Sequence, residues 1–277
     1  MGLCAAGERP RGTGYHQPVR TAVVTGGSSG IGLAVARELE RRGGWQLIIA
    51  ARRAEPLAAA AAELSAAAVR CDVTVDADVT ALVAAAQDAG GCDLLVHAAG
   101  APARKGVLDA DLATYRASFE VNYLGLVRVA TAFWPLLEVS RGRLVPVVSV
   151  AGTVALAPSA PYASAKSAAL SWARSYGAAA REHGVAVTIV NPGPVATPGF
   201  PQDQLLRSRW GKLLVVDAER CAERLLAAAD RRLPEVYVPH WWRLAAALQG
   251  TAPGLMARVA ERAWRRDPRL APEPARA

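Results

Sequence analysis

The sequence lacks several features that would place it in specialised classes of protein. No apolar stretch approaches the roughly eighteen residues that a membrane-spanning helix needs, and no apolar signal core follows the N-terminus. The four cysteines, Cys4, Cys71, Cys92 and Cys221, are widely spaced, and neither a C-x-x-C pair nor a histidine cluster at metal spacing accompanies them. We therefore expect a globular protein without a metal site, in a reducing, cytoplasmic compartment.

Lysine is scarce as well, although the chain is basic. The 32 Lys and Arg residues, of which three are lysines, outweigh 24 Asp and Glu residues and give a net charge of +8. Much of the excess lies in residues 1–20 and 256–277. No basic stripe with a reading helix or interleaved aromatics appears, so we expect solvated basic tails and no nucleic-acid partner.

What is present predicts one α/β domain with a substantial core, since 52% of the 277 residues are hydrophobic. Short apolar runs alternate with longer helical patterns. The runs that predict strands are Thr21–Thr25, Gln46–Ala51, Ala68–Cys71, Asp93–His97, Arg143–Val150, Val185–Val190 and Glu235–Val238. The patterns that predict helices are Gly32–Arg42, Glu55–Ala67, Ala77–Ala89, Leu112–Val139, Ala163–Glu182 and Ala218–Ala229. This alternation predicts a single doubly wound, Rossmann-like parallel sheet with helices on both faces.

The distribution of these patterns along the sequence divides the chain into three parts. Residues 1–19 are predicted to be a flexible basic leader, and residues 20–239 a dinucleotide-binding catalytic domain. A loop at about 198–216 is expected to cover the substrate, and its many apolar residues favour an apolar one. Residues 240–277 are expected to form a helical, basic extension.

A glycine-rich turn follows the first predicted strand. The segment Thr25–Gly32 (TGGSSGIG) has glycines at positions 26, 30 and 32, which allow a tight turn, a close approach of a pyrophosphate and close packing of the following helix. The first N–H groups of that helix would then face the anion. The turn therefore predicts cofactor contacts, which we assign to Gly26, Ser28, Ser29, Gly30, Ile31 and Gly32.

The same turn also fits a motif of another class. Gly26–Gly30 satisfies G-x-S-x-G, the nucleophile elbow of α/β-hydrolases, with Ser28 as the nucleophile. An elbow on the first strand, however, has no earlier strand and loop that could supply the second oxyanion donor. The hydrolase thus stays the less favoured alternative.

The residues that discriminate between a dinucleotide-binding enzyme and a hydrolase lie far downstream, at Tyr162 and Lys166. Positions i and i+4 of a helix share a face, so the Lys166 ammonium can reach toward the Tyr162 phenol and lower its pKa from about 10 toward the working pH. Tyr162 would then donate or accept a proton for an alcohol–ketone pair. Ser149 closes an earlier strand at the sheet edge where ligands bind in this architecture.

Taken together, these motifs resemble those of the short-chain dehydrogenase/reductase superfamily, of the type with a T-G-x-x-x-G-x-G turn and a Y-x-x-x-K helix. The likeness runs from about Arg20 to about Pro239. It implies that Tyr162 is the catalytic acid/base, that Ser149 polarises the substrate carbonyl, and that Lys166 lowers the Tyr162 pKa and holds the nicotinamide ribose. It further implies that Asn122 anchors a water of the proton relay.

The resemblance also assigns cofactor contacts outside the turn, with Tyr162 and Lys166 among them. The remaining contacts that it implies are Asp72 and Val73 near adenine, Ala98, Ala99 and Gly100 near a ribose, and Pro192, Gly193, Val195 and Thr197 near the nicotinamide. One departure is His97, which stands where the family often has an amide. We interpret His97 as a structural hydrogen-bonding residue rather than a catalyst.

The second predicted strand indicates which dinucleotide is bound. An acid at its end would bind the ribose 2′-hydroxyl of NAD, whereas an arginine accommodates the 2′-phosphate of NADP. Here Ala51 takes the place of the acid and Arg52 follows, so the sequence predicts NADP(H) in preference to NAD(H). Ser28 and Ser29 would add hydroxyl donors.

These observations predict an NADP(H)-dependent oxidoreductase acting on a small carbonyl or alcohol. A catalytically idle dinucleotide-binding module is a further alternative, which Ser149 disfavours because binding alone does not need it. The resemblance implies a homodimer or homotetramer through the predicted helices Leu112–Val139 and Ala163–Glu182. The Trp-bearing segment that begins at His240 could cover the substrate site, bury a face against another subunit or, less favoured, lie on an anionic membrane surface.

Overall fold

The computed structural model describes residues 19–103, 105–154, 159–197 and 215–266. The strands are β1 (Arg20–Thr25), β2 (Trp45–Ala51), β3 (Ala67–Arg70), β4 (Leu94–His97), β5 (Arg143–Pro146), β6 (Ala186–Val187), β7 (Ile189–Pro192) and β8 (Glu235–Val238). The α-helices are α1 (Gly30–Arg42), α2 (Ala54–Glu63), α3 (Asp76–Asp88), α4 (Leu112–Phe119), α5 (Gly125–Ser140), α6 (Ala160–Glu182), α9 (Ala218–Asp230), α10 (Trp242–Thr251) and α11 (Pro253–Arg266). Two short helical segments are the π-helical η1 (Glu120–Leu124) and the 3-10 turn η2 (Val150–Gly152).

The strands form a parallel sheet in the order β3-β2-β1-β4-β5-β6, and β7 pairs in parallel with β8. A bridge between Val147 and Val190 joins the pair to the larger sheet. The strand order reverses between β1 and β4, so the crevice at their carboxyl ends is the place where ligands bind in doubly wound sheets. The predicted fold class, a Rossmann-like α/β sheet, is confirmed.

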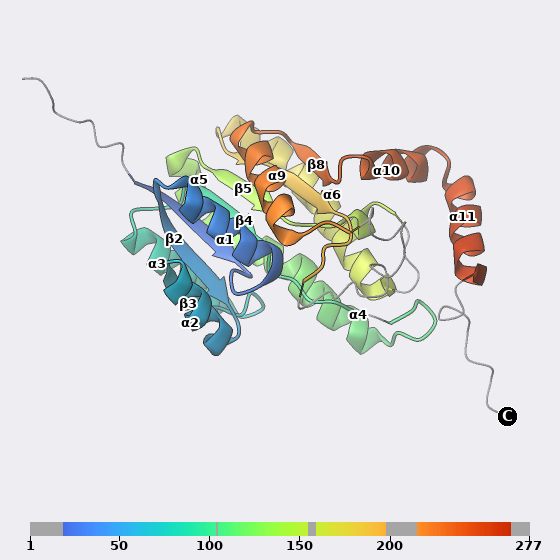
Figure 1. Cartoon of the computed structure of the whole chain (residues 1–277), viewed down its shortest axis with the longest axis horizontal. Helices are drawn as coiled ribbons and strands as arrows, with labels where there is room; N and C mark the ends of the chain where they lie inside the picture. The colour runs from blue at the N-terminus through green and yellow to red at the C-terminus, as the bar shows by residue number, and fades with distance from the viewer. Residues whose placement is uncertain (1–18, 104, 155–158, 198–214, 267–277) are drawn as a thin grey trace, which may run out of the picture.

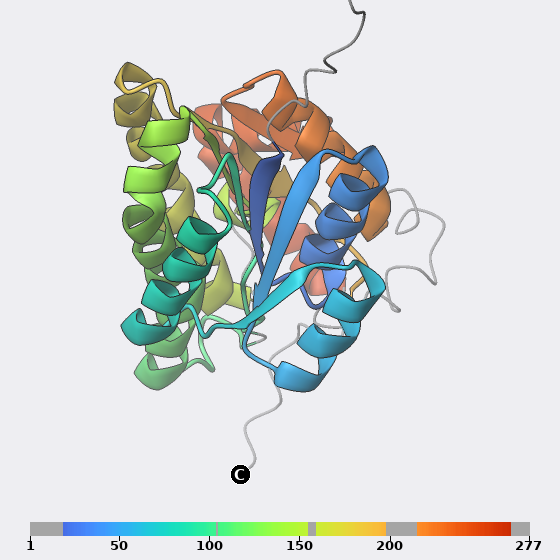
Figure 2. The ribbon, with the colours of Figure 1, turned by 90° about the vertical axis from the view of Figure 1, so that its left-hand side faces the viewer.

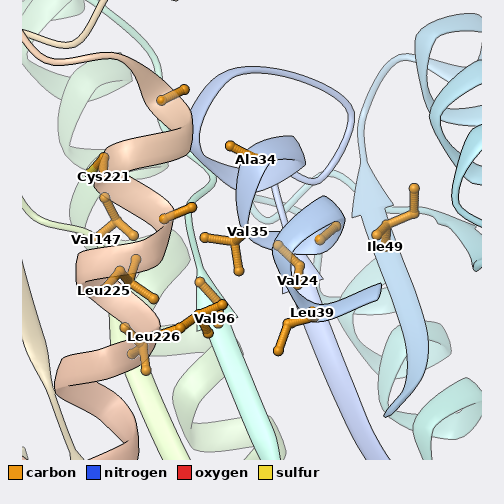
Figure 3. Close-up of a cluster of buried hydrophobic side chains, with 14 of the residues drawn as sticks. Val24, Ala34, Val35, Leu39, Ile49, Val96, Val147, Cys221, Leu225 and Leu226 are labelled. Atoms are coloured by element: carbon orange, nitrogen blue, oxygen red, sulfur yellow. The ribbon is translucent and has the colours of Figure 1, made fainter. Parts of the chain in front are cut away.

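Helices cover both faces of the sheet (Figures 1 and 2). One face packs against α1, α2 and α9, and the other against α3, α5 and α6. Figure 3 shows the side chains between the sheet and the helices α1 and α9: Leu225 and Leu226 of α9 lie near Val35 of α1 and Val96 of β4. These side chains are almost fully buried, and burial of each contributes roughly 1.5–3 kcal/mol. The packed layers hold the strand ends that form the crevice.

Several predicted boundaries need correction. The helix predicted at Glu55–Ala67 ends at Glu63, because Ser65 turns the chain in a left-handed conformation (φ 48°) and Ala67 then pairs with Ile48 of β2. Alanine favours a helix there, but strand pairing outweighs that preference. The strand predicted at Arg143–Val150 ends at Pro146 and continues as the Val147 bridge and η2. The run Val185–Val190 is divided between β6 and β7.

The predicted helix Leu112–Val139 is also more complex than expected. It consists of α4, the π-helical η1 and α5, which ends one residue later, at Ser140. Single π-turns of this kind are frequent at functional sites. Asn122 lies in this segment and is buried.

The chain beyond β8 forms α10 and α11, which extend past the end of the sheet (Figure 1). In α11, Leu255 and Val259 lie four residues apart and are both about half exposed. Among the described helices, none combines the length and apolar composition needed to cross a membrane. Nearly all of the predicted leader and of the predicted substrate loop lies outside the described residues.

Candidate active site

A cavity of about 450 Å³ opens at the carboxyl ends of the central strands. It brings together most of the predicted site residues from segments far apart in the sequence. Those lining it are Gly26, Ser29, Gly30, Ile31, Gly32, Ala98, Ala99, Gly100, Asn122, Ser149, Tyr162, Lys166, Pro192, Gly193, Val195 and Thr197. Ser28, Arg52, Asp72 and Val73 are not part of its lining.

The glycine-rich turn packs so closely that side chains would block it. Gly26 has a positive φ of 71°, and a Cβ there would lie 2.8 Å from the Ala98 carbonyl carbon. A Cβ on Gly32 would collide with the carbonyl group of Gly26. Ser29 is the N-cap of α1 but makes no side-chain capping bond to the described residues, so the first N–H groups of α1 face the cavity without that partner. The turn therefore fits the pyrophosphate of a dinucleotide.

Arg52 and Asp72 lie together just outside the cavity. Ala51 ends β2 and is buried, whereas the Arg52 side chain is 66% exposed and its Nη1 lies 3.7 Å from Asp72 Oδ2. Burial opposes ionisation of Asp72, but hydrogen bonds from Thr74 and the charge of Arg52 bring its pKa below the ordinary value. Asp72 is thus ionised at neutral pH, and its exposed ion pair with Arg52 is weak enough for another anion to compete.

Tyr162 and Lys166 occupy the first turns of α6. The Lys166 Nζ lies 5.7 Å from the centroid of the Tyr162 ring and donates a hydrogen bond of 3.0 Å to the Val147 carbonyl. Ser149 forms a hydrogen bond with Tyr162, and its Oγ accepts another from the Ala151 N–H at 3.1 Å. The serine, the tyrosine and the lysine thus meet at one wall of the cavity.

The pKa of Tyr162 differs from the prediction. Burial raises it to about 12, against the lowering effect of the Ser149 hydrogen bond. Burial also lowers the pKa of Lys166 to about 8. The prediction that Lys166 brings the Tyr162 pKa toward neutral is therefore wrong for this arrangement, because desolvation of the phenolate outweighs the Ser149 hydrogen bond, and the Lys166 Nζ is directed to the Val147 carbonyl. Tyr162 is a neutral phenol at pH 7.

Asn122 is held on all sides by main-chain groups. Its Nδ2 donates to the carbonyl oxygens of Ala101 and Ser118, both at 3.0 Å, and its Oδ1 accepts from the Ala101 N–H at 3.1 Å. The side chain therefore ties the loop after β4 to α4. That Asn122 anchors a water remains a prediction.

His97 is a buried, hydrogen-bonded residue, as interpreted from the sequence. Its Nδ1 lies 3.1 Å from the Thr25 Oγ1, across the β1–β4 pair. Burial, together with the charge of Lys166, lowers the His97 pKa to about 3. The imidazole is neutral at pH 7 and does not line the cavity.

Trp242 is a cavity residue that no sequence motif assigned. It begins α10 and lines the cavity with the residues after β7. The signal in the sequence was the Trp pair directly after the last predicted strand. Of the three roles considered for that segment, the position of Trp242 favours a cover over the substrate site.

Comparison with known proteins identifies the family. Residues 20–204 match the family model described as short chain dehydrogenase. The chain belongs to the short-chain dehydrogenase/reductase family. It is therefore an oxidoreductase that acts on the alcohol or carbonyl group of a small molecule and uses NAD(P). Membership argues against Ser28 as a hydrolase nucleophile, and Ser28 also lies outside the cavity lining.

Individual relatives agree with this assignment. A putative ketoacyl reductase of Streptomyces coelicolor is 32% identical over 76% of this chain and 83% of its own length. The 1-deoxy-11-beta-hydroxypentalenate dehydrogenase of Streptomyces exfoliatus is 39% identical over 66% of this chain and 70% of its own length. A variant of actinorhodin polyketide ketoreductase, solved with NADPH, superposes with a TM-score of 0.73 at 26% identity, covering 80% of this chain and 97% of that chain.

Proposed function

We propose that this family member is an NADP(H)-dependent oxidoreductase that interconverts a carbonyl and an alcohol on a small, largely apolar molecule, with Tyr162 as the acid/base. The observation that carries the proposal is the meeting of Ser149, Tyr162 and Lys166 in one cavity with the glycine-rich turn. A module that merely binds a dinucleotide would not need Ser149 beside the tyrosine.

The predicted cofactor contacts, in and beside the cavity, suit the successive parts of a dinucleotide. Residues 26–32 would hold the pyrophosphate, and Asp72 and Val73 the adenine. The segment 98–100 and Lys166 would hold the nicotinamide ribose, and residues 192–197 the nicotinamide. When bound, the dinucleotide supplies the hydride for reduction of the carbonyl carbon or accepts it from the alcohol.

The protein's own part in the reduction is proton transfer and orientation. Ser149 donates a hydrogen bond to the carbonyl oxygen and so polarises the C=O bond. As that oxygen gains the electron pair of the C=O π bond, Tyr162 gives it the phenolic proton, which its raised pKa keeps in place at neutral pH. In the oxidative direction, Tyr162 takes the proton back.

Two observations support NADP(H) over NAD(H). Arg52 directly follows β2, whose last residue, Ala51, has no carboxylate, and a 2′-phosphate could compete with Asp72 for its exposed guanidinium. A related ketoreductase was solved with NADPH. Comparing NADPH and NADH affinities in wild type and Arg52→Ala tests the assignment, with Arg53→Ala as control; an unchanged ratio for Arg52→Ala would contradict it.

The mechanism is tested with a panel of carbonyl compounds and alcohols, followed by NADPH absorbance. Tyr162→Phe is expected to lose at least about 100-fold in kcat, because the proton donor is removed, and to keep measurable binding of NADPH, since the other predicted cofactor contacts remain. Tyr176→Phe is the matched control, since Tyr176 lies on the same helix, has a pKa similarly raised to about 12 by burial and bonds Ala130 instead. Equal turnover by wild type and Tyr162→Phe would overturn the mechanism.

We also place the enzyme in the cytoplasm as a homo-oligomer. The buried free thiols of Cys71, Cys92 and Cys221 suit a reducing compartment. Half-buried aromatic side chains on α5 and α6 suit a subunit interface.

A further inference from the structure

The helices α10 and α11 form an arm that packs little against the rest of the molecule. They follow β8 and extend past the end of the sheet (Figure 1). The structure describes all ten residues of α10, and none of them is buried. The main contacts of α11 are with α10. Because most helices in proteins are stabilised by packing of an apolar face, an exposed apolar face on this arm indicates a further partner.

Such a face is present on α11. Leu255 and Val259 lie one helical turn apart and are 47% and 50% exposed. Met256, three residues before Val259, belongs to the same face and is partly buried. On α10, Leu244 and Leu248 form a second exposed pair at the same spacing. The arm therefore presents aliphatic side chains from both of its helices.

The charges of the arm are almost all positive. Residues 240–266 contain five arginines and a single acidic residue, Glu261. Arg258 precedes Val259 by one residue and Arg262 follows it by three, so both exposed side chains flank the apolar face on one side. Neither arginine takes part in an ion pair within the part of the chain that the structure describes. Glu261 follows Val259 by two residues, about 200° around the helix, and thus lies on the far side.

This combination is typical of helices that lie on anionic membranes. Such a helix has one aliphatic face and a polar face rich in basic residues, and its total hydrophobicity is low. The aliphatic stems of arginines lie along apolar surface, while their guanidinium groups bind lipid phosphates. A second copy of the chain is a less suitable partner, because a two-fold contact between two α11 helices would bring their arginines together.

We propose that α11 docks on the surface of an anionic membrane, with Leu255 and Val259 inserted between the headgroups and Arg258 and Arg262 bound to lipid phosphates. The sequence alone made this the less favoured role of the segment, and the exposed apolar face of α11 is the observation that favours it. The membrane contact is separate from the proposed redox reaction and does not depend on it. Since α10 begins at the cavity with Trp242 and is roughly 15 Å long, the docked arm holds the cavity close to the membrane.

The test is co-sedimentation of the full chain with lipid vesicles. One set of vesicles consists of phosphatidylcholine alone, and the other contains phosphatidylglycerol as about one third of the lipid. We expect the wild type to bind the mixed vesicles and not the neutral ones, and to bind more weakly as the salt concentration rises, because salt screens the arginine–phosphate attraction. Equal binding to both sets, or no binding to the mixed vesicles at low salt, would overturn the proposal.

A pair of double variants tests the arginines. Arg258→Gln combined with Arg262→Gln should weaken binding to the mixed vesicles about 30-fold, the loss expected for two arginines at an anionic surface. The matched control is Arg220→Gln combined with Arg224→Gln, because these arginines are also exposed and four residues apart, but lie on α9. The control should bind nearly as the wild type does. An equal loss in both double variants would show an effect of net charge alone and would contradict docking through α11.

A second pair tests the apolar face without a change of charge. Leu255→Gln combined with Val259→Gln should weaken binding at least about 10-fold, because these side chains no longer gain from leaving water. Leu108→Gln combined with Leu112→Gln is the control, since these leucines are 88% and 58% exposed and lie outside the arm. Circular dichroism and thermal unfolding verify that each variant is folded.

Light scattering without vesicles separates lipid from a second subunit as the partner of this face. We expect the variant with glutamine at positions 255 and 259 to keep the mass of the wild type. A smaller mass for this variant, together with unchanged vesicle binding, would assign the face to a contact between subunits and overturn the membrane proposal. The oxidoreductase assignment would stand in either case, since it is measured by turnover.

Discussion

At the scale of single residues, Lys166 in the cavity wall and His97 behind it are two buried bases that influence each other electrostatically. Lys166 is 5% exposed and His97 2%, and the charge of Lys166 contributes to the low pKa of His97. Desolvation disfavours both cations, but Lys166 keeps a carbonyl acceptor in Val147 whereas His97 Nε2 has no partner among the described residues. The lysine is therefore the group that carries charge near neutral pH.

Because of His97, the free energy of unfolding should decrease as the pH falls. Its pKa is about 3 in the fold and about 6.5 in the unfolded chain, so its contribution is complete above pH 6.5 and is lost as the pH falls toward 3. Between pH 8 and pH 5 we expect a loss of about 2 kcal/mol in the free energy of unfolding, measured by urea titration. His97→Asn should remove this part of the pH dependence, and an unchanged slope in the variant would contradict the assignment.

Spacing in the sequence was enough to predict Tyr162, Lys166 and Ser149, because an i, i+4 pair and a strand end have fixed geometric meanings. The pKa of Tyr162 could not be predicted in this way, since it depends on how deeply the folded chain buries the phenol. Trp242 could not be assigned either. It reaches the cavity through the tie between Gly193 and Val238, and no local pattern reveals such a contact.

At the scale of elements, the sequence predicted the helices and strands themselves better than the places where one segment passes into the next. Apolar periodicity marks a helix over Leu112–Val139, yet it cannot show the additional residue per turn that makes η1 a π-helix. Arg128 supports this joint from α5, donating to Glu120 at 3.0 Å and to the Val73 carbonyl at 3.0 Å. The π-turn thus depends on long-range contacts that are established only in the fold.

The junction of β1 and α1 yields a prediction of its own. In Gly32→Ala the new methyl group would meet the Gly26 carbonyl, and backbone on both sides would have to shift. We expect destabilisation by about 1–3 kcal/mol and at least about 10-fold weaker NADPH binding, measured by thermal unfolding and NADPH fluorescence.

Gly250→Ala provides the contrast for this variant. Gly250 lies in α10, and a Cβ there meets nothing within 4 Å, so alanine should stabilise the helix by roughly 0.5–1 kcal/mol and leave NADPH binding unchanged. Comparable NADPH affinity in Gly32→Ala and Gly250→Ala would argue against close backbone packing as the reason for glycine at position 32.

At the scale of the whole molecule, two apolar surfaces are candidates for contact with another subunit. On the outer side of α5 and α6, Trp172 stacks on Tyr176 at 4.6 Å, and Trp134 meets the same tyrosine edge to face at 5.8 Å. On α10, Leu244 is 66% exposed. The aromatic cluster offers three side chains in mutual contact, and aromatic side chains are enriched in subunit interfaces.

Light scattering coupled to size exclusion can decide between these surfaces. We expect wild type to run as a dimer or tetramer and Trp172→Glu to shift to a smaller species, because a carboxylate at the centre of an apolar interface would be desolvated without a partner. Leu244→Glu should keep the mass of wild type. If Leu244→Glu dissociates and Trp172→Glu does not, the interface belongs to the C-terminal helices. A monomeric wild type at micromolar concentration would contradict the oligomer, and the aromatic cluster would then be surface packing within one subunit.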